Sequence, residues 1–498
     1  MPEGPLLLGV DVGTTTAKAG VFDLDGRLLS FADSDYGIDR PQSDWAEQDP
    51  RIWWQAFVRI VDALAAGVDV TRIRAVGICS QVNTHVFLGE DGAELAPAIV
   101  WQDQRAANEA AALTALLAEA ELTVDASALV ARAAWMQRYR GDVWETTRWI
   151  LSPKDYLNHR LTGQTATDVI SPIGLVDADS RYDRRIVELV PGLPERLPPL
   201  RRFTDPLGRV RSTGSRLPPE AEVVVATMDA WGNLYGSGVV EPGQAMEVAG
   251  TSEILGVLSE HAEPTDGVVT FPPLDGTYLH AGPTQAGGDA LRWFADTHGL
   301  ALETVLKRAA TAPPGSGGLV FLPYLAGERA PLWDAEARGV FFGLSSDHSL
   351  AHQARAVLEG VAFSARHLLE TLEHAAGLHV DALASSGGGA RSDLWCQIKA
   401  DVLAREIRRL RVLQSGVLGA GLIAATGTGL AGDLRSAAAA AVEVADVFRP
   451  APDRVALYDH LYRVYRGLYP ALQPAYRELS RFRSRFSHHR EKGSPNAC

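Results

Sequence analysis

Two stretches of the chain share one pattern of apolar and polar positions. In the first, an apolar run at 6–10 is followed by Asp-Val-Gly-Thr-Thr-Thr-Ala-Lys at 11–18 and by further apolar residues at 19–22. The second, at 245–258, repeats the order of apolar run, Gly-Thr-hydroxyl turn and apolar run. Apolar runs joined by such turns predict antiparallel strands, and the Asp-Leu-Asp-Gly turn after residue 22 extends the first stretch to a β-meander. The recurrence favours a duplicated fold with a cleft between its halves, and chance recurrence of a three-residue word is the alternative.

Between and after these stretches, runs of strand length alternate with runs of helical period. Apolar runs predict strands at 74–80, 222–226 and 383–386. Amphipathic periodicity predicts helices at 50–66, 351–373, 391–405 and 418–426. This alternation predicts an α/β fold. A Glu-Pro-Gly hinge at 241–243 predicts an N-terminal domain over 1–241 and a C-terminal domain over 242–450, with a helix and a frayed tail over 451–498.

Composition adds limits on partners and compartment. The 498 residues are 46% hydrophobic and carry a net charge of −14, which argues against broad binding of nucleic acid or an anionic membrane and leaves room for one small anionic ligand. Three scattered cysteines, Cys79, Cys396 and Cys498, cannot form a disulfide framework or a zinc cluster, so we expect a reducing compartment. An acidic start and the lack of an eighteen-residue apolar run predict a cytoplasmic protein without a membrane anchor.

The first Gly-Thr turn is a candidate phosphate site. Clustered backbone N–H groups and the hydroxyls of Thr14, Thr15 and Thr16 suit phosphate oxygens, and Lys18 adds a positive charge. Asp11, at the end of the preceding strand, is a candidate carboxylate for a magnesium ion held through water. An ordinary hairpin turn, with Asp11 as its cap, is the alternative interpretation.

The ends of two further predicted strands are candidate ligand-binding positions. Asp229 follows the strand predicted at 222–226 and opens a Gly-rich helix start, where α/β sheets place their ligands, although a simple helix cap is the alternative. Three glycines at 387–389 end another strand and let a flat ring or a phosphate approach the backbone closely. P-loop, HExxH and GxSxG motifs do not occur, which disfavours P-loop, zincin and serine-hydrolase chemistry.

Taken together, the two Gly-Thr turns, the aspartate between them and the triple glycine resemble the FGGY carbohydrate kinases. The resemblance covers residues 7 to about 432. It is carried by the blocks DVGTTTAK at 11–18, WAEQDP at 45–50, WQDQR at 101–105, PKDYL at 153–157, GTS at 250–252, FLPYLAGERAP at 321–331, GVFFGL at 339–344 and GGGARS at 387–392.

The resemblance implies two actin-like (ribonuclease H-like) ATPase domains with an interdomain cleft. It places sugar binding, the first phosphate motif and the catalytic aspartate in 1–241, and nucleotide binding in 242–450. ATP and Mg²⁺ are implied, with Asp229 as catalytic base and Asp11 as the magnesium-linked carboxylate. The implied ATP-binding residues are Thr14, Thr15, Thr16, Lys18, Gly250, Thr251, Ser252, Gly288, Gly388, Gly389 and Ser392.

Within the family the likeness is greatest to xylulokinases, so the resemblance implies conversion of D-xylulose to D-xylulose 5-phosphate. The implied substrate-binding residues are Gln81, Val82, Asn83, Trp101, Asp103, Arg105 and Asp229. Val82 and Asn83 stand where typical xylulokinases have Met and His, which keeps L-xylulose, ribulose, erythritol and glycerol open as acceptors. A non-transferring actin-like ATPase is the alternative from another class. We expect a small sugar or polyol as partner, and a homodimer is compatible with the sequence.

Overall fold

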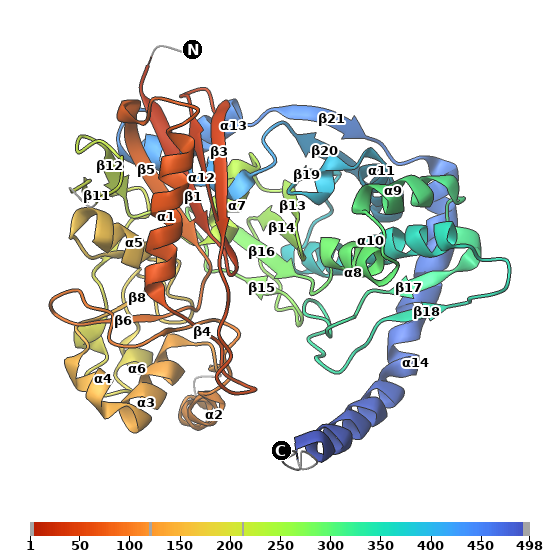
Figure 1. The fold of residues 1–498 in the computed structure, drawn as a ribbon, viewed down its shortest axis with the longest axis horizontal. Helices are drawn as coiled ribbons and strands as arrows, with labels where there is room; N and C mark the ends of the chain where they lie inside the picture. Colours follow the sequence, from red (N-terminus) through yellow and green to blue (C-terminus); the bar gives the residue numbers. More distant parts are fainter. Residues whose placement is uncertain (1–3, 119–121, 212–213, 492–498) are drawn as a thin grey trace, which may run out of the picture. The chain divides into compact units, whose positions relative to one another are not determined.

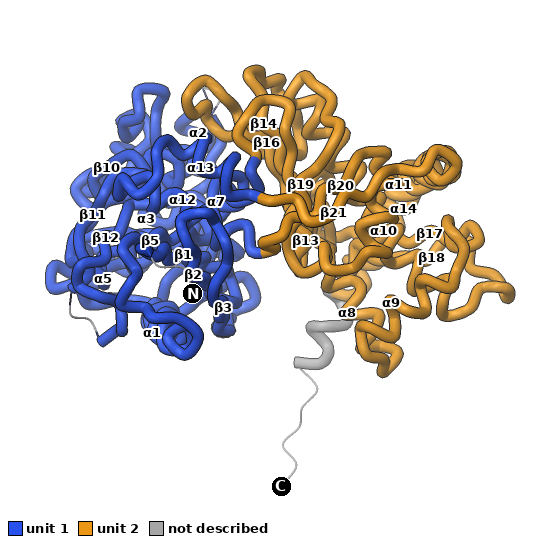
Figure 2. The backbone as a smooth tube through the Cα atoms, turned by 90° about the horizontal axis from the view of Figure 1, so that it is seen from above, with its two compact units in different colours: residues 1–238, 414–442 blue, residues 239–413, 443–498 orange. Residues whose placement is uncertain are grey.

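The chain folds into two compact units. The computed structural model describes residues 4–118, 122–211 and 214–491, with side chains described to Arg483. Unit 1 comprises residues 1–238 and 414–442, and unit 2 comprises residues 239–413 and 443–498 (Figure 2). The chain therefore passes from unit 1 to unit 2, returns for one segment, and ends in unit 2.

Unit 1 is built on a sheet of six described strands in the order β11-β12-β5-β1-β2-β3 (Figure 1). Strands β1, β5 and β12 run parallel, whereas β2 and β3 continue from β1 as an antiparallel meander. The strands of this sheet are β1 (Leu6–Val12), β2 (Thr16–Phe22), β3 (Leu28–Asp35), β5 (Ile73–Ser80), β11 (Pro206–Arg209) and β12 (Glu222–Val224). The meander predicted for the first stretch is confirmed.

Helices cover both faces of this sheet. The side chains of Val10 and Val12 share a core with α1 and α5, and alternation along β1 sends Gly9 and Asp11 to the opposite face, toward α12. The helices are α1 (Pro50–Leu64), α2 (Ala107–Leu116), α3 (Leu129–Tyr139), α4 (Gly141–Thr146), α5 (Pro153–Thr162), α6 (Arg184–Val187), α7 (Asp229–Gly236), α12 (Ser415–Gly427) and α13 (Leu434–Ala441). Short pairs of strands are β4 (Glu47–Gln48) with β7 (Ala98–Ile99), β6 (Val86–Leu88) with β8 (Trp149–Leu151), and β9 (Thr167–Asp168) with β10 (Leu200–Arg201).

Unit 2 repeats this arrangement in a sheet of order β15-β16-β14-β13-β19-β20-β21. Its strands β13, β14 and β16 form the antiparallel part, and β13, β19 and β20 are parallel. The strands of the unit are β13 (Ala245–Ala249), β14 (Glu253–Ser259), β15 (Val269–Thr270), β16 (Tyr278–Pro283), β17 (Val320–Leu322), β18 (Val340–Phe342), β19 (Ala382–Ser386), β20 (Glu406–Leu410) and β21 (Val444–Phe448). Its helices are α8 (Gly288–Thr297), α9 (Leu302–Thr311), α10 (Leu350–Ala376), α11 (Asp393–Leu403) and α14 (Pro452–Glu491).

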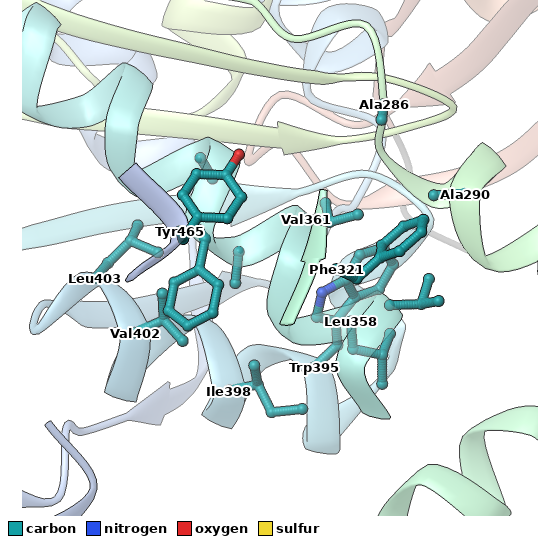
Figure 3. Packing of buried hydrophobic residues seen from close by; sticks show 14 of the residues in the cluster. Ala286, Ala290, Phe321, Leu358, Val361, Trp395, Ile398, Val402, Leu403 and Tyr465 are labelled. Atoms are coloured by element: carbon teal, nitrogen blue, oxygen red, sulfur yellow. The ribbon is translucent and has the colours of Figure 1, made fainter. Parts of the chain in front are cut away.

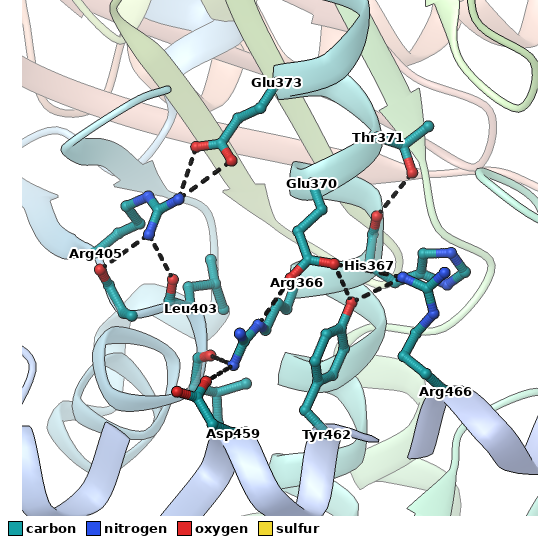
Figure 4. A network of polar contacts seen from close by, with 12 residues as sticks. Arg366, His367, Glu370, Thr371, Glu373, Leu403, Arg405, Asp459, Tyr462 and Arg466 are labelled. Atoms are coloured by element: carbon teal, nitrogen blue, oxygen red, sulfur yellow. Dashed lines mark hydrogen bonds and ion pairs between the residues drawn. The ribbon is translucent and has the colours of Figure 1, made fainter. Parts of the chain in front are cut away.

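In unit 2, helix α10 is held to α11 by apolar contacts and to α14 by polar contacts. The core joins Leu358 and Val361 of α10 to Trp395 and Ile398 of α11 (Figure 3). Polar side chains attach α14 to α10, where Glu370 accepts from Tyr462 at 2.6 Å and Arg366 pairs with Asp459 at 2.7 Å (Figure 4). The helix expected after residue 450 is thus present, and the last part of the expected tail, 492–498, lies outside the described residues.

Sequence periodicity located the main elements. The helices expected at 50–66, 351–373, 391–405 and 418–426 correspond to α1, α10, α11 and α12, and the expected strands correspond to β5, β12 and β19. The domain assignment differs in one segment, since 414–442 belongs to unit 1 and had been expected in the C-terminal domain. The physical reason is that α12 packs on β1, β5 and α7, an association between segments far apart in sequence.

This packing depends on glycines. A Cβ atom on Gly9 would lie 1.9 Å from the carbonyl oxygen of Val417, and one on Gly77 would lie 2.0 Å from that of Ala420. On the other side of α12, a Cβ on Gly419 would lie 1.8 Å from the carbonyl oxygen of Gly232. Helix α12 therefore contacts the backbone of the sheet and of α7 directly. Among the described helices, none is long and apolar enough to span a membrane.

We predict that Gly419→Ala destabilises the protein by about 1–3 kcal/mol, because the added methyl group meets backbone atoms that cannot rotate away. Chemical denaturation measures this difference. Gly432→Ala is the matched control, since a Cβ there has no heavy atom within 4 Å. Equal stability of the two variants would contradict the described contact.

Candidate active site

In unit 1, the carboxyl ends of three parallel strands bring the predicted residues together. The turn after β1 holds Thr14, the loop after β5 begins at Gln81, and the segment after β12 leads to Asp229. The Gln81 N–H donates to the Val12 carbonyl at 2.9 Å, and a β-bridge joins Ser80 to Met228. One edge of one sheet therefore carries the first phosphate turn, the expected substrate loop and the expected base.

The turn between β1 and β2 is tight and held from outside. The Gly13 N–H donates to the Thr16 carbonyl at 3.1 Å, and the Tyr36 hydroxyl donates to the Gly13 carbonyl at 2.7 Å. The Thr16 hydroxyl donates to Asp35 at 2.6 Å, whereas Thr15 is exposed. The backbone conformation of the turn is thus fixed before any ligand binds.

Asp11 and Lys18 are directly opposite each other on β1 and β2. Burial raises the pKa of Asp11, and the nearby Lys18 charge opposes that rise. The Asp11 Oδ1 atom is buried without a hydrogen-bond partner among the described residues. An unpartnered carboxylate oxygen is suited to a cation or a bound water, although no group of three or more His, Cys, Asp or Glu side chains in the described part of the chain could hold a metal.

Asp229 is the first residue of α7, and its carboxylate accepts the Ala230 N–H at 2.8 Å. Burial raises its pKa to about 7, with a further contribution from the negative charge of Asp11. The side chain of Asn233 donates to the Asp229 carbonyl at 2.9 Å and accepts from Ser415 at 2.7 Å. Helix α12 thus contributes to the placement of Asp229 through Asn233, a contact that sequence reasoning missed.

The expected substrate loop borders a small, partly open pocket. Gln81 and Ser171 line it, and their Oε1 and Oγ atoms are buried without a hydrogen-bond partner among the described residues. Val82 and Asn83 line it as well, and Asn83 has a positive φ of 50°. The Asn83 side chain donates to Ser127 at 3.0 Å. Asp229 is not part of this lining.

The structure places the predicted residues Asp103 and Arg105 in contact with each other. The fully buried Asp103 carboxylate accepts the Ala46 N–H at 2.6 Å and pairs with the Arg105 guanidinium at 2.7 Å. Arg105 also pairs with Glu47 at 2.8 Å and lies 3.6 Å above the Trp45 ring. Because these groups are already paired, they hold the loop in place in this structure, and a direct contact of either with substrate stays a prediction.

Arg132 of α3 is a further residue of the site that sequence reasoning missed. Its guanidinium is fully buried, and it donates to the backbone carbonyl groups of Asn83, Ile99 and Val100. Burial of Arg132 lowers its pKa to about 9. The pKa of His85 lies well below its usual range, because His85 is itself buried and lies near the Arg132 charge. A single arginine within the apolar run 129–136 was the signal that could have found it.

In unit 2, the three expected nucleotide motifs lie together at the ends of β13 and β19. The Gly288 N–H at the start of α8 donates to the Gly250 carbonyl at 2.9 Å, and the Asp289 N–H donates to the Thr251 carbonyl at 3.1 Å. A Cβ on Gly389 would lie 2.9 Å from that of Ala249. The turn 250–252, the start of α8 and the glycines 387–389 therefore form one group.

The individual residues of this group differ in their exposure to solvent and in their hydrogen bonds. Thr251 and Gly388 are exposed, and a Cβ on Gly388 would have no heavy atom within 4 Å. Ser252 is half-buried. The Ser392 hydroxyl accepts the Trp395 N–H at 3.3 Å, so it caps α11 in this structure.

Comparison with known proteins agrees with this geometry. Residues 6–230 match the model of the FGGY family of carbohydrate kinases, N-terminal domain, and residues 245–428 match that of the C-terminal domain. The chain belongs to the FGGY family of carbohydrate kinases. The predicted fold of two actin-like ATPase domains and the predicted kinase activity are thereby confirmed, and this FGGY kinase is xylulokinase-like in sequence.

Individual relatives of this FGGY kinase differ in the substrate they are named for. It is 30% identical to a xylulose kinase of Lactococcus lactis over 491 residues, covering 93% of this chain and 96% of that protein. It matches the structure of a xylulose kinase from Lactobacillus acidophilus with a TM-score of 0.85 and 26% identity, covering 95% and 100% of the two chains. A gluconate kinase from the same species matches with a TM-score of 0.85 and 25% identity, covering 95% and 99%.

We predict that Asp229→Asn stabilises this FGGY kinase at pH 8, by about 1–3 kcal/mol, because the amide removes a poorly solvated, half-buried charge and keeps the acceptor for Ala230. The folded protein holds a proton on Asp229 up to about pH 7, whereas an unfolded chain loses it near pH 4, so the unsubstituted protein loses stability as the pH rises between these values. The advantage of the variant should therefore shrink from pH 8 to pH 4 in denaturation experiments. A constant difference over this range would show that Asp229 titrates normally.

Proposed function

We propose that the protein transfers the γ-phosphoryl group of ATP to a hydroxyl of D-xylulose and so forms D-xylulose 5-phosphate. The observation that carries the proposal is the half-buried Asp229 carboxyl, whose pKa of about 7 suits a general base, at the same sheet edge as the first phosphate turn. The likeness to xylulose kinases over nearly the whole chain supports the choice of sugar.

In this mechanism Asp229 accepts the proton of the attacking hydroxyl. The hydroxyl oxygen forms a bond to the γ-phosphorus while the bond from that phosphorus to the β,γ-bridging oxygen breaks, which releases ADP. Phosphoryl transfer has a loose transition state, so alignment and neutralisation of charge supply most of the catalysis. A base of pKa about 7 is largely ionised just above neutral pH and still accepts a proton readily.

We assign the phosphate contacts to both Gly-Thr turns. Residues Thr14, Thr15, Thr16 and Lys18 bind the outer phosphates in unit 1. Residues Gly250, Thr251, Ser252, Gly288, Gly388, Gly389 and Ser392 bind the nucleotide in unit 2. The unpartnered Oδ1 atom of Asp11 fits a magnesium ion held through water, and such an ion would neutralise phosphate charge.

The charges around the substrate loop favour a neutral acceptor. Among the described residues that line the pocket none is Lys or Arg, and its His85 has a strongly lowered pKa and is therefore neutral at pH 7. Nearby Arg105 is paired with two carboxylates and Lys154 with Asp155 and Asp168. Arg132 is fully buried and bound to backbone carbonyls, so among the described residues that line the pocket an anionic acceptor such as gluconate would meet no cation. The buried Gln81 oxygen can accept a sugar hydroxyl.

The decisive experiment measures ADP release with D-xylulose, L-xylulose, ribulose, erythritol, glycerol and gluconate, ranked by kcat/KM. We expect D-xylulose to rank first and gluconate to react at least about a hundredfold less efficiently, because unpaired buried groups discriminate by such factors. A gluconate preference would overturn the choice of acceptor. ATP hydrolysis at an equal rate without any acceptor would favour the non-transferring ATPase.

We further predict that Asp229→Ala lowers kcat at least about a hundredfold, the usual contribution of a positioned base, while ATP affinity changes little. Coupled-enzyme kinetics and nucleotide titration measure the two quantities. The exposed Asp347, in unit 2, provides the control Asp347→Ala, which should leave both unchanged. Near-normal turnover of Asp229→Ala would remove Asp229 from this role.

A further inference from the structure

We propose that Gln48 is a positioning residue that couples occupancy of the sugar loop to the phosphate turn of unit 1. Through it, sugar binding raises the affinity for nucleotide. The inference rests on the proposed function, since it requires that sugar and nucleotide bind to the same protein.

Gln48 lies between the two sites and is buried, with 1% of its surface exposed. Its side-chain amide is fully used in the structure. The Nε2 group donates to the carbonyl oxygens of Thr14 and Gly37, each at 2.8 Å. The Oε1 atom accepts from Nε2 of Gln81 at 3.4 Å. Gln48 thus links the backbone of the phosphate turn to the side chain of the expected sugar-binding residue.

A second link runs in parallel through Trp101. Its indole N–H donates to the Thr14 hydroxyl at 2.9 Å, and its backbone N–H donates to the Thr84 hydroxyl at 3.2 Å. Thr84 belongs to the same loop as Gln81. The Thr14 residue is therefore held at its carbonyl by Gln48 and at its hydroxyl by Trp101, and both contacts lead to the sugar loop.

These linked hydrogen bonds end, on the side of the sugar loop, at an acceptor atom that is available to a ligand. The Gln81 Oε1 atom is buried and has no hydrogen-bond partner among the described residues, so it can accept a hydroxyl of the acceptor. Accepting that bond polarises the Gln81 amide and strengthens its donation to Gln48, since linked hydrogen bonds reinforce one another. The Gln81–Gln48 hydrogen bond, at 3.4 Å, is the longest of these linked hydrogen bonds, so it can shorten and strengthen the most. Thr14 is then held more firmly for the nucleotide phosphates.

Coupling of this kind is reciprocal and measurable. The coupling factor is the dissociation constant of a non-hydrolysable ATP analogue without sugar divided by that with saturating sugar, and coupled sites commonly give about 5- to 150-fold. We expect at least about fivefold for the unsubstituted protein. A residue that only supports the fold would change both dissociation constants by the same factor and leave the ratio unchanged.

The test substitutes Gln48→Met, which keeps the length of the side chain and removes all three hydrogen bonds. Calorimetric titration with the analogue and D-xylulose, or the best acceptor of the panel, should give a coupling factor below about twofold. Gln104→Met is the matched control, since Gln104 is exposed in the same region, and it should keep the full factor. Trp101→Phe, which keeps a smaller aromatic ring and loses the indole N–H, should lower the factor in part and decides the question if Gln48→Met does not fold.

A coupling factor near one in the unsubstituted protein would overturn the inference, as would an unchanged factor in folded Gln48→Met or, where that variant does not fold, in Trp101→Phe. These outcomes are distinct from failure of the proposed function, which would appear as no phosphorylation of any acceptor by the unsubstituted protein.

Discussion

The close packing of α12 against the backbone of β1, β5 and α7, at glycines that have no side chain, is the constraint on which unit 1 depends. At Gly9 and Gly77 the helix touches the sheet, and at Gly236 and Gly419 it touches α7, with too little space for a Cβ atom at any of these contacts. The same helix begins at Ser415, which bonds to Asn233, and a Cβ on Gly416 would lie 2.9 Å from Asp11. The packing that closes the domain therefore also sets the positions of both candidate carboxylates.

Those carboxylates carry an electrostatic cost. Asp11 and Asp229 are both half-buried, both have raised pKa values, and the charge of Asp11 adds to the rise at Asp229. Groups held in an unfavourable state lower stability and are common where chemistry needs them. The positive charge of Lys18 compensates part of this cost at Asp11, and the first turn of α7 compensates part at Asp229 through the Ala230 N–H.

Around the substrate loops, most charged groups neutralise each other. Asp103 pairs with Arg105, and Lys154 pairs with Asp155 and Asp168. Arg132 instead binds backbone carbonyls, so it orders two loops at once. Among the described residues, the Gln81 Oε1 and Ser171 Oγ atoms that line the pocket have no hydrogen-bond partner, and a polyhydroxy acceptor would supply one to each.

Local patterns predicted much of this protein. The meander at the start, the helices α1, α10 and α12 and the strands β5 and β19 follow from apolar periodicity, because a short segment carries its own period. Asp11, Thr14 and Asp229 could be selected because they stand at strand ends, and parallel strands end at one edge of a sheet. Likewise, the turn at 250–252 and the glycines at 387–389 could be selected from local sequence, whereas Gly288 was implied by the family resemblance alone.

Only the tertiary structure decided how distant segments meet. The sequence does not indicate that 414–442 returns to unit 1, that Arg132 lies beneath the loop of Asn83, or that Gln48 reaches Thr14. It also suggested substrate contact for Asp103 and Arg105, whose charges are paired with each other in the fold. The physical reason is common to all of these cases: residue type and spacing record the local backbone, whereas burial, pairing and raised pKa values depend on which side chains the folded chain places around each group.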